Sequence, residues 1–254
     1  MSAVQSFIAR QGELCRTFDE RFIREPFRLD GNAHFIEEFA PRHLPAGAVV
    51  YDIGGGKQPL IPAAKKRALG LKVIGLDIDR QELARAPSGA YDQVICADIQ
   101  TYRGVGDADM VICQAVLEHV RSQRAAMEGV FSALKPGGLA VVWIPCRNAC
   151  YARMNLALPE SLKTRILFTV FPKAEEAQGF PAYYDCCTPR QFRALIAEHQ
   201  GLIVDERYYF RSWYFSFFLP IYVLWRLWVQ MFHFVAGEEA CESFSLAFRK
   251  NSAP

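Results

Sequence analysis

Residues 48–58 read AVVYDIGGGKQ, an apolar run through Asp52 and Ile53 that leads into three consecutive glycines. The run is typical of a buried strand, and the glycines allow the backbone to approach a ligand and to point amide groups toward it. By itself, such a turn is weak evidence for a cofactor site. A dinucleotide-binding fingerprint would require another glycine at position 59, where the chain has Pro59, so a nicotinamide cofactor loses support.

Strand and helix patterns alternate downstream of this turn. The predicted strands lie at residues 72–77, 93–97, 109–113, 139–144, 202–210 and 243–250, and the predicted helices at residues 80–86, 121–134 and 188–201. Strands that alternate with helices at this spacing form right-handed βαβ units and a mainly parallel sheet. The sequence therefore predicts one α/β domain over residues 1–254, a Rossmann-like three-layer sandwich.

Composition excludes several classes of function. The chain has 254 residues and a formal net charge of +2, with acidic and basic residues well mixed. Because this balance lacks the concentrated basic surface of a nucleic-acid binder, no nucleic-acid partner is expected. The eight cysteines show no paired framework, and no histidine pair completes a tetrahedral metal set. We therefore expect reduced thiols, no metal site and a cytoplasmic protein, since charged residues interrupt any signal-like N-terminal segment.

Two carboxylates follow the strand predicted at residues 72–77. Asp77 stands where a carboxylate of nucleotide-binding α/β proteins can accept hydrogen bonds from both ribose hydroxyls. Asp79 precedes Arg80-Gln81-Glu82 in the pattern of a capping box, which makes it the better cap for the next helix. We therefore assign ribose binding to Asp77 and helix capping to Asp79.

Five motifs occur in a characteristic order. They are Val50–Gly56 (VYDIGGG), Val73–Asp79 (VIGLDID), Ala97–Ile99 (ADI), Asp109–Val120 (DMVICQAVLEHV) and Leu134–Gly138 (LKPGG). In this order the chain resembles the class I S-adenosylmethionine-dependent methyltransferases, in the broad branch that includes ubiquinone-pathway and many small-molecule enzymes. The resemblance is close over residues 48–146 and continues in outline beyond. It implies a seven-stranded, mainly parallel sheet whose last strand is antiparallel.

The resemblance also implies S-adenosylmethionine as the cofactor and assigns its contacts. The methionine end would be held by Asp52 and the turn, the ribose by Asp77 with Ile78 beside it, and the adenine ring by Asp98 and Ile99. Gln114 would line the site near the sulfonium. The turn residues are Gly54, Gly55 and Gly56. One position departs from the family pattern, because Gln58 stands where many relatives have a third glycine; the surplus Gly55 would compensate.

Methyl transfer depends on positioning and desolvation more than on covalent help, because the sulfonium already carries an excellent leaving group. A hydroxyl acceptor usually also needs a base, for which histidine is a suitable residue type. His119 is the predicted catalytic residue, although its Leu-Glu-His-Val context is more typical of a structural or cofactor-contacting role. Tyr183, Tyr184, Asp185 and His199 are alternative bases, and Tyr183 and Tyr184 are also predicted to bind the substrate.

Segments around this core divide the chain further. Residues 1–46 predict a helical cap over the site, residues 47–146 the cofactor-binding core and residues 147–187 a lid or substrate-binding insertion. Residues 188–254 form the C-terminal part, which contains an apolar insertion at residues 212–238 before the last strand.

The apolar run from Trp213 to Val235 has the length of a membrane span. Because the strands on either side of it are predicted to pair in one sheet, a single crossing would leave the last strand on the wrong side. Tyr222, Arg226, Gln230 and His233 would form one polar stripe along a helix. Two alternatives stay open: a helix in the membrane interface, or a helix packed over the sheet or against a second subunit.

These features predict S-adenosylmethionine-dependent O-methylation of a small or lipid-linked acceptor, such as a glycolipid, a quinone or a natural product. The protein would be cytoplasmic, with peripheral contact to the inner face of the membrane through residues 213–235, and a homo-oligomer is compatible with this arrangement. The alternative is a catalytically inactive nucleotide-binding scaffold or partner subunit, which Gln58 and the lack of an obvious base would favour. A nicotinamide oxidoreductase ranks third.

Overall fold

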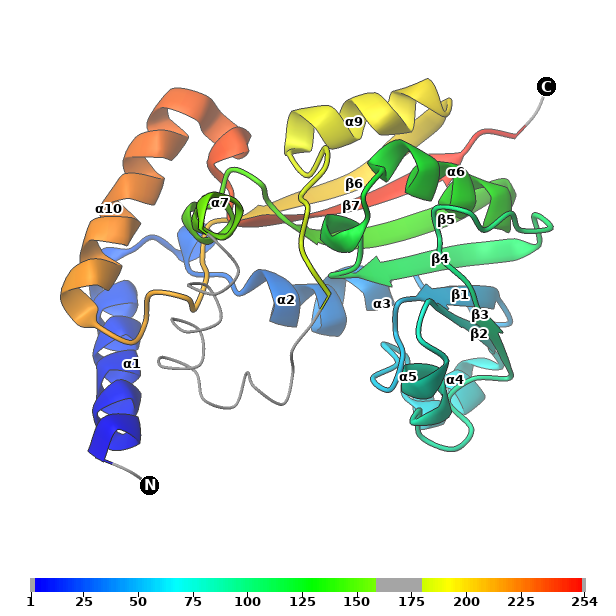
Figure 1. Ribbon diagram of the computed structural model, residues 1–254, viewed down its shortest axis with the longest axis horizontal. Helices are drawn as coiled ribbons and strands as arrows, with labels where there is room; N and C mark the ends of the chain where they lie inside the picture. The colour runs from blue at the N-terminus through cyan, green and yellow to red at the C-terminus, as the bar shows by residue number, and fades with distance from the viewer. Residues whose placement is uncertain (1–2, 159–179, 253–254) are drawn as a thin grey trace.

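A computed structural model describes residues 3–158 and 180–252 of the chain. In these residues seven strands form one sheet in the order β3-β2-β1-β4-β5-β7-β6 (Figure 1). The strands are β1 (Val49–Ile53), β2 (Lys72–Asp77), β3 (Gln93–Cys96), β4 (Ala108–Gln114), β5 (Leu134–Pro145), β6 (Gly201–Tyr209) and β7 (Ser243–Lys250). The last strand, β7, pairs antiparallel with both β5 and β6. The predicted fold class is therefore confirmed.

Alternating side chains of the central strands build two separate cores. In β1, Val50 belongs to a buried cluster on one face of the sheet, whereas Tyr51 and Ile53 belong to the cluster on the other face. In β4, Met110 belongs to the same cluster as Val50, and Val111 belongs to the cluster on the other face. Because successive strand residues point to opposite faces, apolar residues at every position bury both faces. The sheet is consequently the middle layer of a three-layer sandwich.

Helices cover both faces of the sheet. They include α4 (Ala63–Leu69), α5 (Arg80–Ala84), α6 (Gln123–Ala133) and α9 (Pro189–Glu198). Each of the last three begins at a residue whose side chain accepts a backbone N–H of the first turn, namely Asp79, Ser122 and Thr188. The predicted capping role of Asp79 is confirmed, but the reciprocal half of a capping box is not made, because the Asp79 N–H donates to Asp77 Oδ1.

One strand begins earlier than predicted. The sequence Lys135-Pro136-Gly137-Gly138 predicts a turn before a strand at residues 139–144, but β5 already begins at Leu134. The pairing between β4 and β5 shifts register between Ala108 and Met110, and Gly137 has a φ of +75°. This irregularity absorbs the Pro-Gly-Gly segment inside the strand, as a bulge does.

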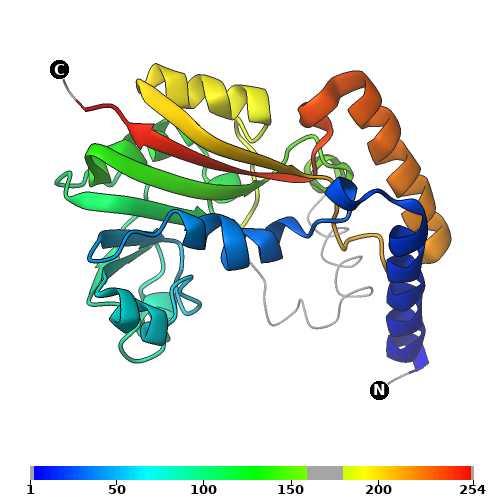
Figure 2. The same ribbon diagram turned by 180° about the vertical axis from the view of Figure 1, so that it is seen from behind.

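The N-terminal segment is helical, as predicted, but it is divided into several helices that lie in different places. The first helix is α1 (Ala3–Phe22), and it is followed by η1 (Glu25–Phe27), α2 (Gly31–His34), η2 (Phe35–Phe39) and α3 (Ala40–Arg42). Helices α2 and α3 run beside the sheet, whereas α1 stands apart next to the C-terminal helix α10 (Leu219–Ala236) (Figures 1 and 2). Only the part after α1 therefore approaches the predicted site.

The predicted lid and the apolar insertion are described in part. The lid begins with a helix, α7 (Cys150–Ala157), and its residues 159–179 lie outside the described residues. The insertion forms α10, followed by η5 (Gly237–Ala240), and it starts and ends at the paired residues Tyr209 and Ser243. Among the described residues, the segment Leu219–Ala240 alone has the length and composition of a membrane-crossing helix, criteria that core helices also meet.

Candidate functional site

Two cavities open at the carboxyl ends of the parallel strands β1, β2 and β4. One, of about 340 Å³, is lined by Asp77 and Asp98, and we refer to it as the Asp77 cavity. The other, of about 290 Å³, is lined by Asp52 and Gln114, and we refer to it as the Asp52 cavity. Both include Gly54 in their walls, so they adjoin one another across the glycine turn. Ligands of open α/β sheets bind at this edge.

The glycine turn is too crowded for side chains at two positions. Gly54 has a φ of +74°, and a Cβ added there would lie 2.1 Å from a methyl carbon of Val116. A Cβ at Gly55 would lie 2.5 Å from the Asp52 carboxylate. Gln58, the departure from the family pattern, closes the turn by donating its N–H to the Gly55 carbonyl at 2.8 Å, and it lines the Asp52 cavity. The surplus Gly55 is thus required by packing against Asp52.

Asp52 is buried beneath this turn. It accepts hydrogen bonds from the Leu60 N–H at 3.0 Å and from the Tyr91 hydroxyl at 3.4 Å. Burial raises the pKa of Asp52 to about 6, although both hydrogen bonds act in the opposite direction. Tyr91 also donates to the Gly56 carbonyl at 3.2 Å, so it holds the carboxylate and the turn together. The sequence analysis missed Tyr91, which lies in a segment without a motif.

Asp77 lies at the end of β2, in the wall of the cavity that bears its name. Its Oδ1 accepts the Asp79 N–H at 2.9 Å, which fixes the carboxylate at the strand end. Burial raises the pKa of Asp77, with nearby Asp79 and Glu82 adding to the effect. Gly56 approaches the other oxygen so closely that a Cβ there would lie 3.1 Å from Oδ2. The carboxylate therefore sits between the turn and the Asp77 cavity, where a ribose would meet it.

The predicted adenine contacts share the same cavity. Asp98, Ile78 and Ile99 all line it. The side-chain amide nitrogen of Gln100 donates to both carboxylate oxygens of Asp98, at 2.9 Å to Oδ2 and 3.1 Å to Oδ1. The Gln100 amide oxygen accepts the backbone N–H groups of Arg121 and Ser122. Gln100, which the sequence analysis missed, thus ties Asp98 to the start of α6.

Gln114 lies at the end of β4 and lines the Asp52 cavity. Its amide nitrogen donates to Asn32 Oδ1 at 2.6 Å, and Asn32 belongs to α2 of the N-terminal segment. The next residue, Ala115, has a φ of +53° and lines both cavities. The predicted cap therefore reaches the site through Asn32, which no sequence motif marks.

His119 lies in the short helix η3 (Leu117–His119) and lines the Asp77 cavity. Its Nδ1 lies 3.1 Å from the Pro181 carbonyl oxygen, and its Nε2 lies 3.7 Å from Glu118 Oε1. The ring thus stands among the predicted adenine contacts and not in the wall of the Asp52 cavity. This position favours the cofactor-contacting role over that of a base.

The other candidate residues divide between the site and the core. Tyr183 lines the Asp77 cavity, and Arg121 lies over its ring at 5.3 Å. Tyr184 is buried in the core and lines neither cavity. Asp185 accepts the Gln123 N–H at 2.8 Å, and His199 stacks on a phenylalanine in the core. The structure therefore brings Tyr183 to the site but not Tyr184 or His199.

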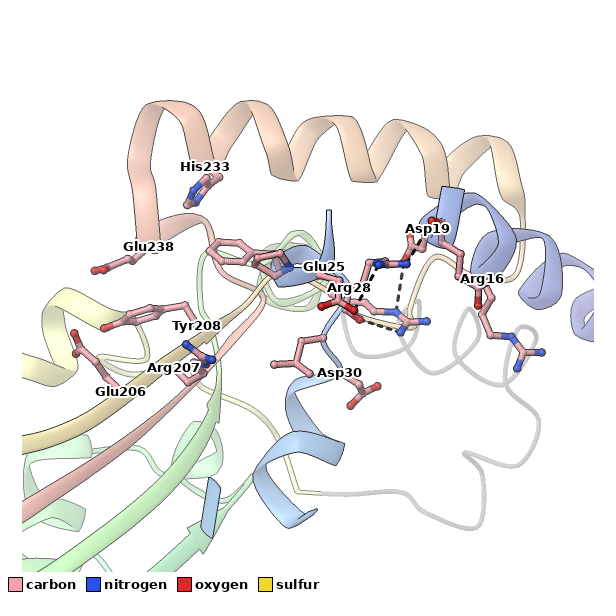
Figure 3. A pocket seen from close by; sticks show the side chains of 15 residues that line it. Arg16, Asp19, Glu25, Arg28, Asp30, Glu206, Arg207, Tyr208, His233 and Glu238 are labelled. Atoms are coloured by element: carbon pink, nitrogen blue, oxygen red, sulfur yellow. Dashed lines mark hydrogen bonds and ion pairs between the residues drawn. The ribbon is translucent and has the colours of Figure 1, made fainter. Parts of the chain in front are cut away.

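A larger cavity, about 750 Å³, lies elsewhere, between α1, the segment that follows it, β6 and α10 (Figure 3). Charged side chains of both signs line it, and several hold neighbouring elements together. Arg211 Nη1 donates to the Arg28 carbonyl at 3.0 Å, and its Nε lies 3.5 Å from Asp19 Oδ2. None of the predicted site residues lines this cavity. We therefore place the functional site at the two smaller cavities.

The chemistry of the two cavities matches the two ends of S-adenosylmethionine. The Asp77 cavity offers a carboxylate for the ribose hydroxyls and the apolar walls of Ile78 and Ile99 for a flat ring. The Asp52 cavity offers a carboxylate and three side-chain amides for the charged methionine end. The residues present therefore fit this cofactor, with Gly54 at the junction.

Comparisons with known proteins agree with this assignment. A family model described as a methyltransferase domain matches residues 20–193. Over 113 residues the chain is 32% identical to the ubiquinone biosynthesis O-methyltransferase of Psychrobacter arcticus and 31% identical to that of Psychrobacter cryohalolentis. Each match covers 41% of this chain and 43% of the relative, so it spans less than half of the length of these proteins.

Solved structures share the fold. An S-adenosylmethionine-dependent methyltransferase from Mesorhizobium loti superposes with a TM-score of 0.54 at 17% identity, over 84% of this chain and 97% of that one. Phosphoethanolamine N-methyltransferase 2 of Haemonchus contortus was solved in complex with S-adenosyl-L-methionine. It superposes with a TM-score of 0.54 at 17% identity, over 99% of this chain and 60% of that one. At these identities the likeness shows a common architecture.

Proposed function

This chain belongs to the methyltransferase domain family of class I S-adenosylmethionine-dependent methyltransferases, and we propose that it methylates an oxygen atom of a small or lipid-linked acceptor. The predicted family and the predicted cofactor are confirmed by the family match over residues 20–193. The acceptor is the part that we propose. The pair of adjoining cavities at Gly54, one suited to each end of the cofactor, places methyl transfer at this site, and the O-methyltransferase relatives support an oxygen acceptor.

The bound cofactor supplies an activated methyl group on a sulfonium, and the protein supplies its position. Asp77 and Asp98 would hold the adenosine end, while Asp52 and the glycine turn would hold the methionine end. The Gln114–Asn32 pair stands at the wall of the Asp52 cavity, where it would align the acceptor with the methyl group. Alignment of this kind can supply most of the catalysis in a displacement reaction.

The polar side chains of the Asp52 cavity support an acceptor whose hydroxyl ionises readily. Its described polar side chains are the amides of Asn32, Gln58 and Gln114 and the carboxylate of Asp52. A phenol or quinol hydroxyl, which ionises readily, would need only weak assistance there as its proton leaves. The curated relatives named above are O-methyltransferases of ubiquinone biosynthesis, which supports an acceptor of this chemical type.

The first test is isothermal titration of the purified protein with S-adenosylmethionine and, separately, with NAD. We expect micromolar binding of S-adenosylmethionine alone, followed by release of S-adenosylhomocysteine only when a phenolic or quinol acceptor is added. Cofactor binding without turnover of any acceptor would favour the inactive scaffold. Binding of neither compound, or of NAD, would contradict the proposal.

A further inference from the structure

The polarity of α10 is inverted relative to a normal surface helix. Its one charged residue, Arg226, is buried, with Nε 2.9 Å from Asp19 Oδ1 and Nη2 3.1 Å from Asp19 Oδ2. Two further guanidinium hydrogens donate to the carbonyls of Phe210 and Phe27. Tyr222, one turn earlier, donates its hydroxyl to Asp19 at 2.7 Å. Most of the predicted polar stripe thus faces α1 and the sheet, and only Gln230 within it is exposed.

The opposite face of α10 is apolar and exposed. Phe234 is 91% exposed and Val235 is 79% exposed, although a folded protein in water normally buries such residues. We call this surface the outer face of α10; it consists of Leu224, Leu227, Trp228, Met231, Phe234 and Val235. A continuous apolar face without charge indicates contact with another apolar phase.

The neighbouring helix α1 has a second exposed apolar surface, formed by Phe7 and Leu14, and arginines lie beside it. Phe7, Arg10, Leu14 and Arg21 recur at spacings of three, four and seven residues, so they share one side of α1. Phe7 and Leu14 are exposed, and Arg21 lies 5.5 Å from the ring of Phe22. Of the acidic residues of α1, Asp19 is buried and Glu20 lies on another side, whereas Glu13 is three residues after Arg10 and shares its side, so this side carries two arginines and one glutamate. The charge at this edge suits anionic groups.

The sheet determines how α10 can meet such a phase. Strands β6 and β7 pair along their whole length, and the insertion leaves at Tyr209 and returns at Ser243, which are partners in the ladder. Both ends of the insertion therefore lie on the same side of any layer that it touches. With 18 residues, α10 is about 27 Å long and can lie flat at a surface. Tryptophan and arginine are residues that favour the headgroup region.

We propose that the outer face of α10 docks in the plane of an anionic lipid bilayer, with Arg10 and Arg21 of α1 contacting the headgroups. The helices α1 and α10 stand beyond the carboxyl edge of the parallel strands, which is the edge where the two cavities open (Figure 1). A lipid-linked acceptor would thus be collected from the bilayer next to the site. This use of the surface rests on the proposed function, whereas the docking itself does not.

The test is sedimentation of the full-length protein with phosphatidylcholine vesicles that contain or lack phosphatidylglycerol. We expect binding, and we expect Val235→Asp to weaken it at least about tenfold, because a charge is placed in the interface. The matched control is Val105→Asp, because Val105 is also a valine, is 84% exposed and lies in the loop before β4. No vesicle binding by the wild type, or equal binding by the two variants, would overturn the proposal.

The charged edge has its own test. Arg10→Gln and Arg21→Gln should each reduce binding to the phosphatidylglycerol vesicles about fivefold and leave binding to phosphatidylcholine alone unchanged. Arg16→Gln is the control, because Arg16 is two positions from Leu14 and faces another way. An equal loss in all three variants would contradict the assigned headgroup contacts.

Two further measurements separate the alternatives. If gel filtration shows a dimer that Val235→Asp converts to a monomer, and vesicles are not bound, a second copy of the chain covers the outer face and the membrane proposal is wrong. Titration with S-adenosylmethionine on the same samples reports the proposed function independently. Cofactor binding without vesicle binding would contradict only the docking proposal. Vesicle binding without cofactor binding would contradict only the proposed function.

Discussion

Asp77 and Asp79 are two residues apart and have the same functional group, but their surroundings differ. Asp77 is buried in the wall of a cavity, whereas Asp79 is half-buried, lies outside that wall and caps α5. Charge, hydrogen-bonding capacity and sequence context are nearly matched between them. The pair therefore provides an internal control for the cofactor assignment.

We predict that Asp77→Ala weakens S-adenosylmethionine binding by about 1 to 3 kcal/mol, because charge-assisted hydrogen bonds to the ribose are lost. Asp79→Ala should have a smaller effect on binding, and should instead lower stability by about 1 kcal/mol through loss of the helix cap. Isothermal titration measures the first effect, and urea denaturation measures the second. Equal losses of affinity in the two variants would contradict the division of roles.

At the scale of elements, a buried ion pair joins the two helices of the proposed membrane surface. Asp19 of α1 and Arg226 of α10 are both almost fully buried, and Arg211 approaches the same carboxylate at 3.5 Å. The pair orients α10, because Arg226 can reach its partners only when the apolar side of the helix faces outward. Buried pairs of this kind contribute specificity more reliably than stability.

Removal of one side chain of the Asp19–Arg226 pair should therefore lower the stability of the fold more than removal of both. We predict that Asp19→Ala destabilises the protein by about 3 to 5 kcal/mol, because Arg226 is left as an unpaired buried charge. The double variant Asp19→Ala with Arg226→Met should recover part of this loss, since it leaves neither charge in the interior. Chemical denaturation of the wild type and the two variants measures the difference. A double variant that is less stable than the single one would show that the pair itself stabilises the fold.

At the scale of the whole molecule, several buried carboxyl groups make stability depend on pH. Burial raises the pKa of Asp52 to about 6, that of Glu242 to about 7 and that of Glu118 to about 8. A carboxyl group whose pKa is higher in the folded than in the unfolded state binds its proton more tightly when folded. Its contribution to stability is therefore present at low pH and is lost as the pH rises through the folded pKa.

Glu242 allows this effect to be isolated. Its Oε1 accepts the Trp225 N–H at 3.2 Å, and its Oε2 has no hydrogen-bond partner among the described residues. We predict that Glu242→Gln, which mimics the protonated acid, gains about 1 to 3 kcal/mol relative to the wild type between pH 5 and pH 8. Denaturation at both pH values measures the change. A constant difference between the two proteins would show that Glu242 does not titrate in this range.

Local patterns determined most of the cofactor-binding half of the molecule. The boundaries of β2 and β7, the caps at Asp79 and Thr188 and the glycine turn all depend on residues close together in the chain. Strand periodicity, capping and positive φ angles act over a few residues, so the sequence alone contains the information. The same motifs carried the family resemblance, and hence the cofactor.

Only the tertiary structure decided which distant residues meet. Gln114 pairs with Asn32, 82 positions earlier, and Arg226 pairs with Asp19, 207 positions earlier. The stripe on α10 suited an inward or an outward orientation equally well, because periodicity shows that a helix has two faces but not which one the protein covers. Likewise, Tyr183 and Tyr184 are adjacent in sequence, yet only Tyr183 reaches a cavity. Packing between segments far apart in the chain made these choices, and no local pattern encodes it.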